Sequence, residues 1–394
     1  MKNNSIININ KSDAGNFYDF LNRISLSQAK KLSFLDDNWV DLEQWKNAAR
    51  KKVLSLLSYS PPPAPLSPNI LNTKDCGSFI QEEVQFNTSA FTRINGTVLI
   101  PKNVTPPYPA FVAIHDHGGF YYYGKEKIID SDIKSKVLLE FKDNLYEGRS
   151  WANELVLKGY LVLVVDAFYF GDRRLNYDEL SDQMKHELGN PLDGNPLDGF
   201  EIDSDPYISA FNDMCNKYEQ FLVRHINTAG ITWPGILAHD DRISVDYLLS
   251  RRDVDPSRIG CGGLSIGALR TMLLAATDSR IKCAVSIGWM PTMESLQHSH
   301  LRFHTFMAYI AGLGEFMDYP DMLSLLAPNY LLVQQCRQDM LFTEEGMIAA
   351  CDIIQAVYDK AGAPDHFKAT FYDCPHIFTV NMQEEAKHWI EEYL

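Results

Sequence analysis

The stretch Gly263-Leu264-Ser265-Ile266-Gly267 decides how this sequence is interpreted. Residues 258–262 before it have the apolar pattern of a short buried strand, and residues 268–276 after it are good helix formers. A serine on a sharp strand-to-helix turn has its hydroxyl lifted clear of the sheet, and a glycine two residues to either side lets neighbouring backbone pack closely. The stretch therefore predicts a nucleophile elbow. The alternative is a tight turn in a Gly-rich loop.

The composition narrows the class of protein. The chain has 394 residues, more than the usual single domain, and its 45% hydrophobic and 22% charged residues are ordinary for a globular enzyme. A formal net charge of −15 repels a phosphate backbone, which argues against nucleic-acid binding, and no apolar run approaches the length of a membrane span. The polar first ten residues lack a signal-peptide pattern, and the seven cysteines are scattered without a C-x-x-C pair. We therefore expect reduced thiols in a cytoplasmic protein.

A proline run divides the chain into two predicted parts. Asp41 can cap a helix that runs to Leu57, and the Pro-Pro-Pro-Ala-Pro run at 61–65 ends it. We expect residues 1–80 to form a helical N-terminal extension and residues 81–394 to form the main, catalytic domain. Two roles stay open for the extension: it covers the pocket, or it contacts a second copy of the chain in a homo-oligomer.

The main domain begins with a strand pattern. Asn95-Gly96, between apolar residues on both sides, is the strongest short-range hairpin signal and predicts an antiparallel start. Six apolar strand candidates follow, and helical patterns separate most of them. Such alternation predicts an α/β fold with a mostly parallel central sheet and helices on both faces. The strand candidates are 110–114, 161–165, 259–262, 283–287, 330–333 and 367–371, and the helical segments are 151–158, 240–251, 267–276, 343–360 and 381–393.

Two segments interrupt this alternation. Residues at about 171–236 and 290–325 are too long to be ordinary connections, so we expect them to form the cap and walls of a pocket. The first segment contains a duplicated pentapeptide, Gly-Asn-Pro-Leu-Asp at 189–193 and again at 194–198. We interpret this repeat as a surface loop without chemistry of its own.

A nucleophilic serine needs a base, and the base needs an orienting acid, both at strand ends on the same side of the sheet. Asp339 follows the strand candidate at 330–333, and His376 precedes the last helix. The order Ser265, Asp339, His376 is that of α/β-hydrolase triads and differs from the trypsin-like and subtilisin-like orders. Glu294 is the fallback acid. The structural alternatives are a helix cap or turn for Asp339 and a hydrogen-bonded histidine near a helix start for His376.

An oxyanion hole needs two N–H donors. Ile266 supplies the first by position, and His117 in the Gly-rich loop His115-Asp116-His117-Gly118-Gly119-Phe120 is the expected second. We expect Trp289, Met290 and Phe120 to line the substrate pocket, although core packing is the common alternative for such side chains.

Two histidine pairs invite a metal site. The H-x-H of His115 and His117 lacks a third ligand nearby, and His300 and His304, four residues apart on an expected helix face, lack the H-E-x-x-H glutamate. We therefore expect no metal, and we interpret His388, inside the final helix, as a surface residue.

Four motifs between about Gln81 and the C-terminus are informative together: the elbow, His115 to Gly119 with Gly124-Lys125-Glu126, Gly171-Asp172-Arg173-Arg174, and Asp253 to Gly260. With these motifs, the chain resembles an α/β-hydrolase of the dienelactone hydrolase and acetyl-xylan-esterase-like group. The resemblance implies ester hydrolysis through an acyl-enzyme with no cofactor. Two positions depart from the group: members often have Gly at the position of Asp116, and dienelactone hydrolases proper use cysteine where this chain has Ser265.

The predicted function is that of a serine esterase acting on a short-acyl ester, for which the resemblance suggests an acetylated sugar. Ser265 attacks the ester carbonyl, His376 transfers its proton to the leaving alcohol, and Asp339 orients the imidazole. A serine peptidase of the prolyl-oligopeptidase type is one alternative, but it would normally carry a propeller, for which roughly 80 residues before the first strand are too few. A non-catalytic binding protein on a hydrolase scaffold is the other, and a complete triad argues against it.

Overall fold

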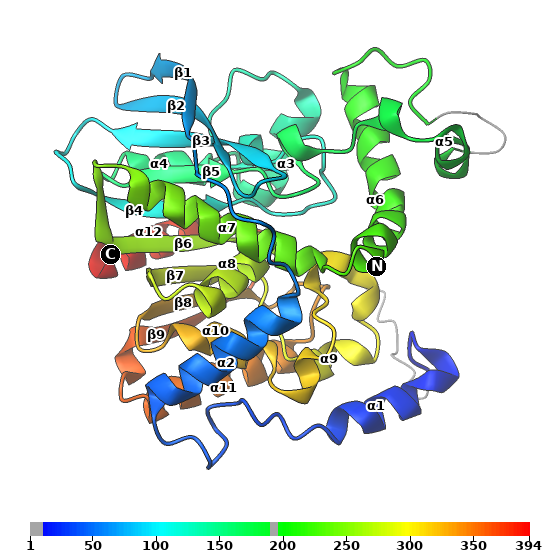
Figure 1. Cartoon of the computed structure of the whole chain (residues 1–394), viewed down its shortest axis with the longest axis vertical. Coiled ribbons are helices and arrows are strands. Elements are labelled where there is room, and N and C mark those ends of the chain that lie inside the picture. The colour runs from blue at the N-terminus through cyan, green and yellow to red at the C-terminus, as the bar shows by residue number, and fades with distance from the viewer. Residues whose placement is uncertain (1–10, 190–195) are drawn as a thin grey trace.

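One mixed sheet organises the part of the chain that the computed structural model describes, residues 11–189 and 196–394. Its strand order is β1-β2-β3-β5-β4-β6-β7-β8-β9 (Figure 1). The pairs from β1 to β5 are antiparallel, and β5, β4 and β6 to β9 run parallel to one another. The strands are β1 Asn69–Asp75, β2 Phe79–Asn87, β3 Arg93–Pro101, β4 Tyr108–Ile114, β5 Leu161–Val165, β6 Val254–Leu264, β7 Ile281–Ile287, β8 Tyr330–Cys336 and β9 Phe367–Tyr372.

Helices cover both faces of this sheet. In β4, Val112 and Ile114 pack into the core on the side of α2, α7, α8 and α11, whereas Phe111 and Ala113 pack into the core on the side of α4 and α12 (Figure 1). This alternation, with both faces buried, is typical of a sheet between two helical layers, so the predicted α/β architecture is confirmed. The helices are α1 Tyr18–Leu26, α2 Leu42–Leu57, α3 Lys136–Tyr146, α4 Trp151–Val156, α5 Asp182–Leu188, α6 Asp205–Thr228, α7 Trp233–Ser250, α8 Ile266–Thr277, α9 Met293–Gln297, α10 Tyr319–Leu323, α11 Glu344–Lys360 and α12 Val380–Tyr393.

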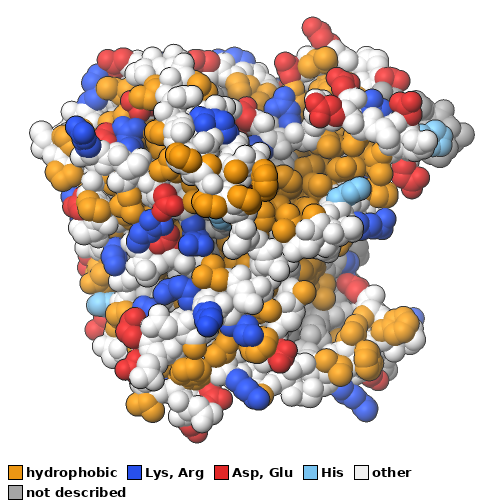
Figure 2. Space-filling model, in the orientation of Figure 1, with side chains coloured by type: hydrophobic (Ala, Val, Ile, Leu, Met, Phe, Trp, Pro, Cys, Tyr) orange, Lys and Arg blue, Asp and Glu red, His pale blue; other side chains and the backbone are white. Residues whose placement is uncertain are grey.

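The first two helices differ in how they meet the rest of the molecule. The Asp41 side chain accepts a hydrogen bond from the Gln44 N–H at 2.8 Å, which caps α2 as predicted. Trp45 of α2 is fully buried and packs on Phe34. No residue of α1 is buried, and the exposed fraction of Phe20 in α1 is 64%. Figure 2 shows hydrophobic side chains gathered over α1.

The prediction that residues 1–80 are helical is wrong for β1. All seven residues of β1 are exposed, and the strand pairs antiparallel with β2 at the edge of the sheet. A strand whose side chains are all exposed leaves no hydrophobic alternation in the sequence, which is why periodicity misses it.

The predicted turn at Asn95-Gly96 is also wrong, although β2 and β3 do form a hairpin. β3 runs straight through these residues, and the turn is closed by the Thr88 N–H donating to the Thr92 carbonyl at 3.0 Å. A Cβ on Gly96 would lie 2.9 Å from Cγ1 of Val165. Glycine is therefore required here for the close packing of β3 on β5, not for a turn.

α6 of the first long segment lies beyond the carboxyl ends of the parallel strands, whereas α10 of the second packs on α8 and α11 (Figure 1). Residues 171–236 contain α5 and α6, and residues 290–325 contain α9, α10 and short 3-10 turns. Residues 190–195 of the duplicated pentapeptide, like the polar residues 1–10, lie outside the described part.

Candidate active site

Ser265 stands on the turn between β6 and α8. Its backbone angles are φ +60° and ψ −119°, a conformation that residues other than glycine rarely adopt. The Ser265 N–H donates to the Ile287 carbonyl at 2.8 Å. A Cβ on Gly263 would lie 2.1 Å from the carbonyl oxygen of Ile114, and one on Gly267 would lie 2.6 Å from the same atom. The flanking glycines therefore let β6 and α8 approach β4, and the turn has the geometry of a nucleophile elbow.

Asp339 and His376 meet in the loops after β8 and β9. Oδ2 of Asp339 lies 2.5 Å from Nδ1 of His376, and Oδ1 accepts from the Leu341 N–H at 2.9 Å. The Asp339 carboxylate is buried, whereas the imidazole is 20% exposed. The two loops are joined by a backbone hydrogen bond of 3.0 Å from the Gln338 N–H to the Cys374 carbonyl. A buried carboxylate on Nδ1 holds the ring in one orientation and leaves Nε2 for another partner.

Ser265 and His376 line one pocket of about 290 Å³. Gly288, directly after β7, has φ +60°, and a Cβ there would lie 3.4 Å from Cε1 of His376. Because Ile287 also accepts the Ser265 N–H, the end of β7 holds His376 beside the elbow. The wall of the pocket is formed by His117, Gly118, Gly119, Asn216, Glu219, Ser265, Ile266, Trp289, Arg302, Phe303, His304, Thr305, Ala308, Leu341 and His376.

His117 and Ile266 both carry an unused backbone donor at this wall. Ile266 is the first residue of α8, so its N–H has no acceptor within the helix. Within the described chain, the N–H of His117 donates to no acceptor, although its carbonyl accepts from Nζ of Lys127 at 3.0 Å. The two donors expected for an oxyanion hole are thus free and belong to the same pocket.

Asp116 is turned away from this pocket. Its side chain is fully buried, accepts a hydrogen bond from the Tyr146 hydroxyl and lies 3.7 Å from Nζ of Lys127. Burial lowers the pKa of Lys127 to about 8, and the charge of Asp116 opposes that shift. Asp116, which stands where the similar group often has Gly, therefore does not line the pocket that holds the proposed oxyanion donors.

Each histidine pair has one member in the pocket wall, His117 or His304, and one outside it, His115 or His300. Nδ1 of His115 donates to the Asp116 carbonyl and Nε2 accepts from the Ala167 N–H. His300 and His304 do not share a helix, because α9 ends at Gln297 and a 3-10 turn follows at Leu301–Phe303; the expected helix face is wrong. Among the residues described, no group of three or more His, Cys, Asp or Glu side chains is arranged to hold a metal ion.

The structure separates the remaining candidates. Trp289 lines the pocket, whereas Phe120 and Met290 do not. Phe120 packs on Phe141 with ring centres 4.8 Å apart, and Met290 is fully buried in the core.

The fallback acid, Glu294, is exposed on α9 and is not among the residues of the pocket wall. His388 is exposed on α12, as expected of a surface residue.

The two long segments contribute polar residues to the pocket wall that were not predicted from the sequence. Asn216 and Glu219 lie three residues apart on α6, so they share one face of the helix. Arg302 and Thr305 come from the second segment. No motif marks these positions, and only the i, i+3 spacing of two polar residues on an amphipathic helix could have pointed to them.

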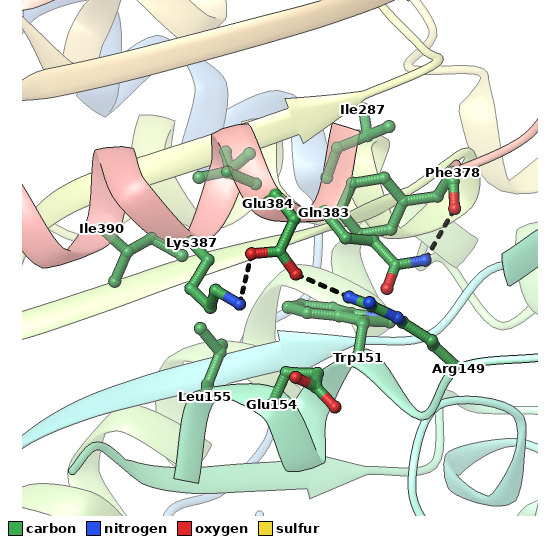
Figure 3. A pocket seen from close by; sticks show the side chains of 12 residues that line it. Arg149, Trp151, Glu154, Leu155, Ile287, Phe378, Gln383, Glu384, Lys387 and Ile390 are labelled. Carbon is green, nitrogen blue, oxygen red and sulfur yellow. Dashed lines mark hydrogen bonds and ion pairs between the residues drawn. The ribbon is translucent and has the colours of Figure 1, made fainter. Parts of the chain in front are cut away.

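A hollow on the opposite face of the sheet is a packing gap. It lies between α4 and α12 and holds only about 10 Å³. Figure 3 shows Trp151 and Ile287 at its wall, with Glu384 bridging Arg149 at 2.6 Å and Lys387 at 2.5 Å. A space this small leaves no room for a substrate.

No family model matches the chain. One relative, "Putative hydrolase YtaP" of Bacillus subtilis (strain 168), is 25% identical over 346 residues, which are 88% of this chain and 98% of the relative.

Three solved structures share the arrangement over almost the whole chain. A "putative acetyl xylan esterase" from Bacteroides fragilis has a TM-score of 0.66 at 17% identity, covering 92% of this chain and 84% of its own. A glucuronoyl esterase from Solibacter usitatus has a TM-score of 0.58 at 14% identity (92% and 96% covered). An acetyl xylan esterase from Paenibacillus sp. R4 has a TM-score of 0.52 at 17% identity (95% and 99% covered).

The chain has the α/β-hydrolase fold. Its mostly parallel sheet, antiparallel N-terminal strands and helical layers agree with these neighbours. In the described residues, no helix has both the length and the apolar character needed to cross a membrane.

Proposed function

We propose that the protein is a serine hydrolase of carboxylic esters. The observation that carries this proposal is the hydrogen bond from His376 to the buried Asp339 carboxylate, with His376 and Ser265 lining one pocket that also holds two free N–H donors. A serine, a histidine and a carboxylate in this order and arrangement support acyl transfer. The relative that is named a hydrolase and the neighbours that are named esterases agree with this chemistry.

In the proposed cycle, the Ser265 hydroxyl attacks the ester carbonyl while Nε2 of His376 takes its proton. Asp339 holds the imidazole and stabilises the imidazolium that forms. The N–H groups of His117 and Ile266 hold the oxyanion of the tetrahedral intermediate. His376 then gives the proton to the leaving alcohol, and water repeats the sequence on the acyl-enzyme. The cycle uses no cofactor.

The proposed substrate is a short-acyl ester of a saccharide. Asn216 and Arg302 give the pocket wall polar groups that can recognise hydroxyl groups. The neighbours named acetyl xylan esterase and glucuronoyl esterase support the same class. Assignment to the dienelactone hydrolase and acetyl-xylan-esterase-like group belongs to this proposal.

We also infer a cytoplasmic location. All seven cysteines are free, and five of them are buried in the core, as expected of a protein folded in a reducing compartment.

Hydrolysis by the native chain and by Ser265→Ala tests the function. The substrates are p-nitrophenyl acetate, butyrate and octanoate, a panel of acetylated and methyl-esterified saccharides, and a peptide p-nitroanilide. We expect turnover of acetate and acetylated saccharides, little turnover of octanoate or the amide, and none in the variant. Ester turnover that survives in Ser265→Ala contradicts the mechanism, and turnover of the amide alone favours a peptidase.

A further inference from the structure

A buried carboxylate in the pocket wall has no part in the cycle described above. Glu219 of α6 is 5% exposed, and its carboxylate accepts three hydrogen bonds from other segments. The donors are Nε2 of His117 at 2.9 Å, the Tyr121 hydroxyl at 3.0 Å and the Thr305 hydroxyl at 2.8 Å. Burial alone would raise the pKa of Glu219, but these hydrogen bonds lower it below its usual value. The side chain is therefore an ionised acceptor at neutral pH.

These contacts determine the state of the His117 ring. Nδ1 of His117 accepts a hydrogen bond from the Gly119 N–H at 3.0 Å, so this nitrogen carries no proton. The ring proton is then on Nε2, where it is donated to Glu219. Opposite edges of the imidazole are thus fixed, one by the carboxylate and one by the backbone of its own loop.

The same loop supplies the proposed oxyanion donor. Its backbone turns through Gly118 at φ +54° and Gly119 at φ +67°. Two consecutive glycines leave the loop backbone flexible unless other contacts hold it. The ring of His117 is further enclosed by Tyr121 and Phe170, with ring centres 5.0 and 5.3 Å away. Holding the ring therefore holds the peptide that carries the His117 N–H.

We propose that Glu219 is a positioning residue for the oxyanion loop, which it fixes through the His117 ring and joins to Thr305 of the second long segment. The proposal rests on the proposed function of Ser265. An oxyanion donor acts only when it is aimed within a few tenths of an ångström, so a carboxylate that orients it affects the rate more than substrate binding.

Glu219→Ala and Glu219→Gln separate this role from a general effect of charge. Alanine removes the acceptor, and we expect kcat for p-nitrophenyl acetate to fall about 30-fold, with KM changed by less than about threefold. In glutamine, the amide oxygen can still accept from His117 and Tyr121, and the amide nitrogen can donate to Thr305. We therefore expect the conservative variant to restore kcat to within about threefold of the native value.

Glu385 offers a matched control outside the pocket. On α12 it accepts hydrogen bonds from Gln334 at 2.7 Å, Thr370 at 2.9 Å and Tyr372 at 2.7 Å. Glu385→Ala loses three hydrogen-bond donors, as Glu219→Ala does, and also an ion pair with Lys368 at 2.7 Å, so it is a control for the loss of a hydrogen-bonded carboxylate outside the pocket. We expect its kcat to stay within about twofold of the native value at temperatures where it is folded.

Two further measurements report positioning directly. Nitrogen-15 spectra of the His117 ring should show a single tautomer protonated at Nε2 in the native protein and loss of that single state in Glu219→Ala. Inhibition by a boronic acid, which forms a tetrahedral adduct on serine, should weaken in Glu219→Ala by about the same factor as kcat.

Several results would overturn the proposal. One is a kcat in Glu219→Ala equal to that in Glu385→Ala. Another is a His117 ring protonated at Nδ1 in the native protein. This second measurement does not require Glu219→Ala to fold. Ester turnover that persists in Ser265→Ala overturns the proposed function itself. Turnover that requires Ser265 and is indifferent to Glu219→Ala overturns only the role of Glu219.

Discussion

At the scale of single residues, the proposal depends on how Asp339 holds His376. The 2.5 Å contact joins Oδ2 to Nδ1, and the other carboxylate oxygen is occupied by the Leu341 N–H. The buried aspartate thereby selects the tautomer in which Nε2 accepts the serine proton.

Replacing Asp339 with asparagine tests this role. The amide keeps the size of the side chain but does not stabilise the imidazolium, so we expect kcat to fall by about 10³ to 10⁴ with little change in stability. Steady-state kinetics and thermal melting measure the two effects. A variant that is folded and within tenfold of native activity would show that Asp339 does not orient the base.

His304 predicts a pH dependence of stability. Burial lowers the pKa of this pocket-wall histidine from 6.5 to about 4. Between these values the unfolded chain binds a proton that the folded chain does not, so the fold is destabilised as the pH falls through this window and is unaffected above it. From pH 7.5 to pH 4.5, we expect the free energy of unfolding of the native protein to fall by about 1–2 kcal/mol more than that of His304→Phe. The effect is limited to this size because the His304 ring is partly exposed.

Urea unfolding of both proteins at several pH values measures this difference. Phenylalanine is chosen because His304 packs against the ring of Phe342, with ring centres 5.1 Å apart. Parallel pH dependences in the two proteins would show that His304 titrates normally in the folded state.

At the scale of elements, the elbow is built by close backbone approach. Gly263→Ala would place a Cβ 2.1 Å from the Ile114 carbonyl oxygen, which belongs to a central strand and has no room to move. We expect this substitution to destabilise the fold by about 3 kcal/mol.

Gly314→Ala is the matched control for the elbow. A Cβ at Gly314 would meet only Sδ of Met293, at an ordinary 3.7 Å, so the expected change is within about 0.5 kcal/mol. Denaturant unfolding compares the two variants. Equal stabilities would mean that β6 and β4 are not packed as closely as the elbow requires.

Elements that bury a regular apolar face could be predicted from the sequence. The strands from β4 to β9 and helices such as α2 are of this kind. The order of Ser265, Asp339 and His376 along the chain was enough to group these three residues as candidates. β1 could not be predicted, because all its residues are exposed and leave no apolar pattern in the sequence. The hairpin turn was misplaced because Gly96 serves strand packing. Glu219 and Thr305 could not be predicted either, because the periodicity of the sequence does not indicate which residues will contact the loop after β4.

At the scale of the whole molecule, the N-terminal extension contains two unlike helices. Trp45 of α2 is fully buried against the core, whereas α1 exposes its apolar residues and packs the Tyr18 ring on His298. Asp13, which precedes α1, forms an ion pair with Arg302. The division into an extension at 1–80 and a catalytic domain at 81–394 stays a proposal.

Truncation tests how much of this extension the fold needs. We expect removal of residues 1–27 to change the free energy of unfolding by less than about 1 kcal/mol, because exposed ion pairs contribute little. Trp45→Ala should cost about 3–5 kcal/mol, because it opens a cavity in the core. Sedimentation of the full and truncated chains also shows whether the extension joins two copies. A truncated chain as unstable as Trp45→Ala would place α1 in the folding core.

Labelling of the folded protein with a fluorophosphonate, followed by mass spectrometry of its peptides, identifies the nucleophile. We expect one adduct, on Ser265, that is absent in Ser265→Ala and forms much more slowly in His376→Ala. An adduct on another serine, or labelling of Ser265 that does not depend on His376, would contradict this expectation.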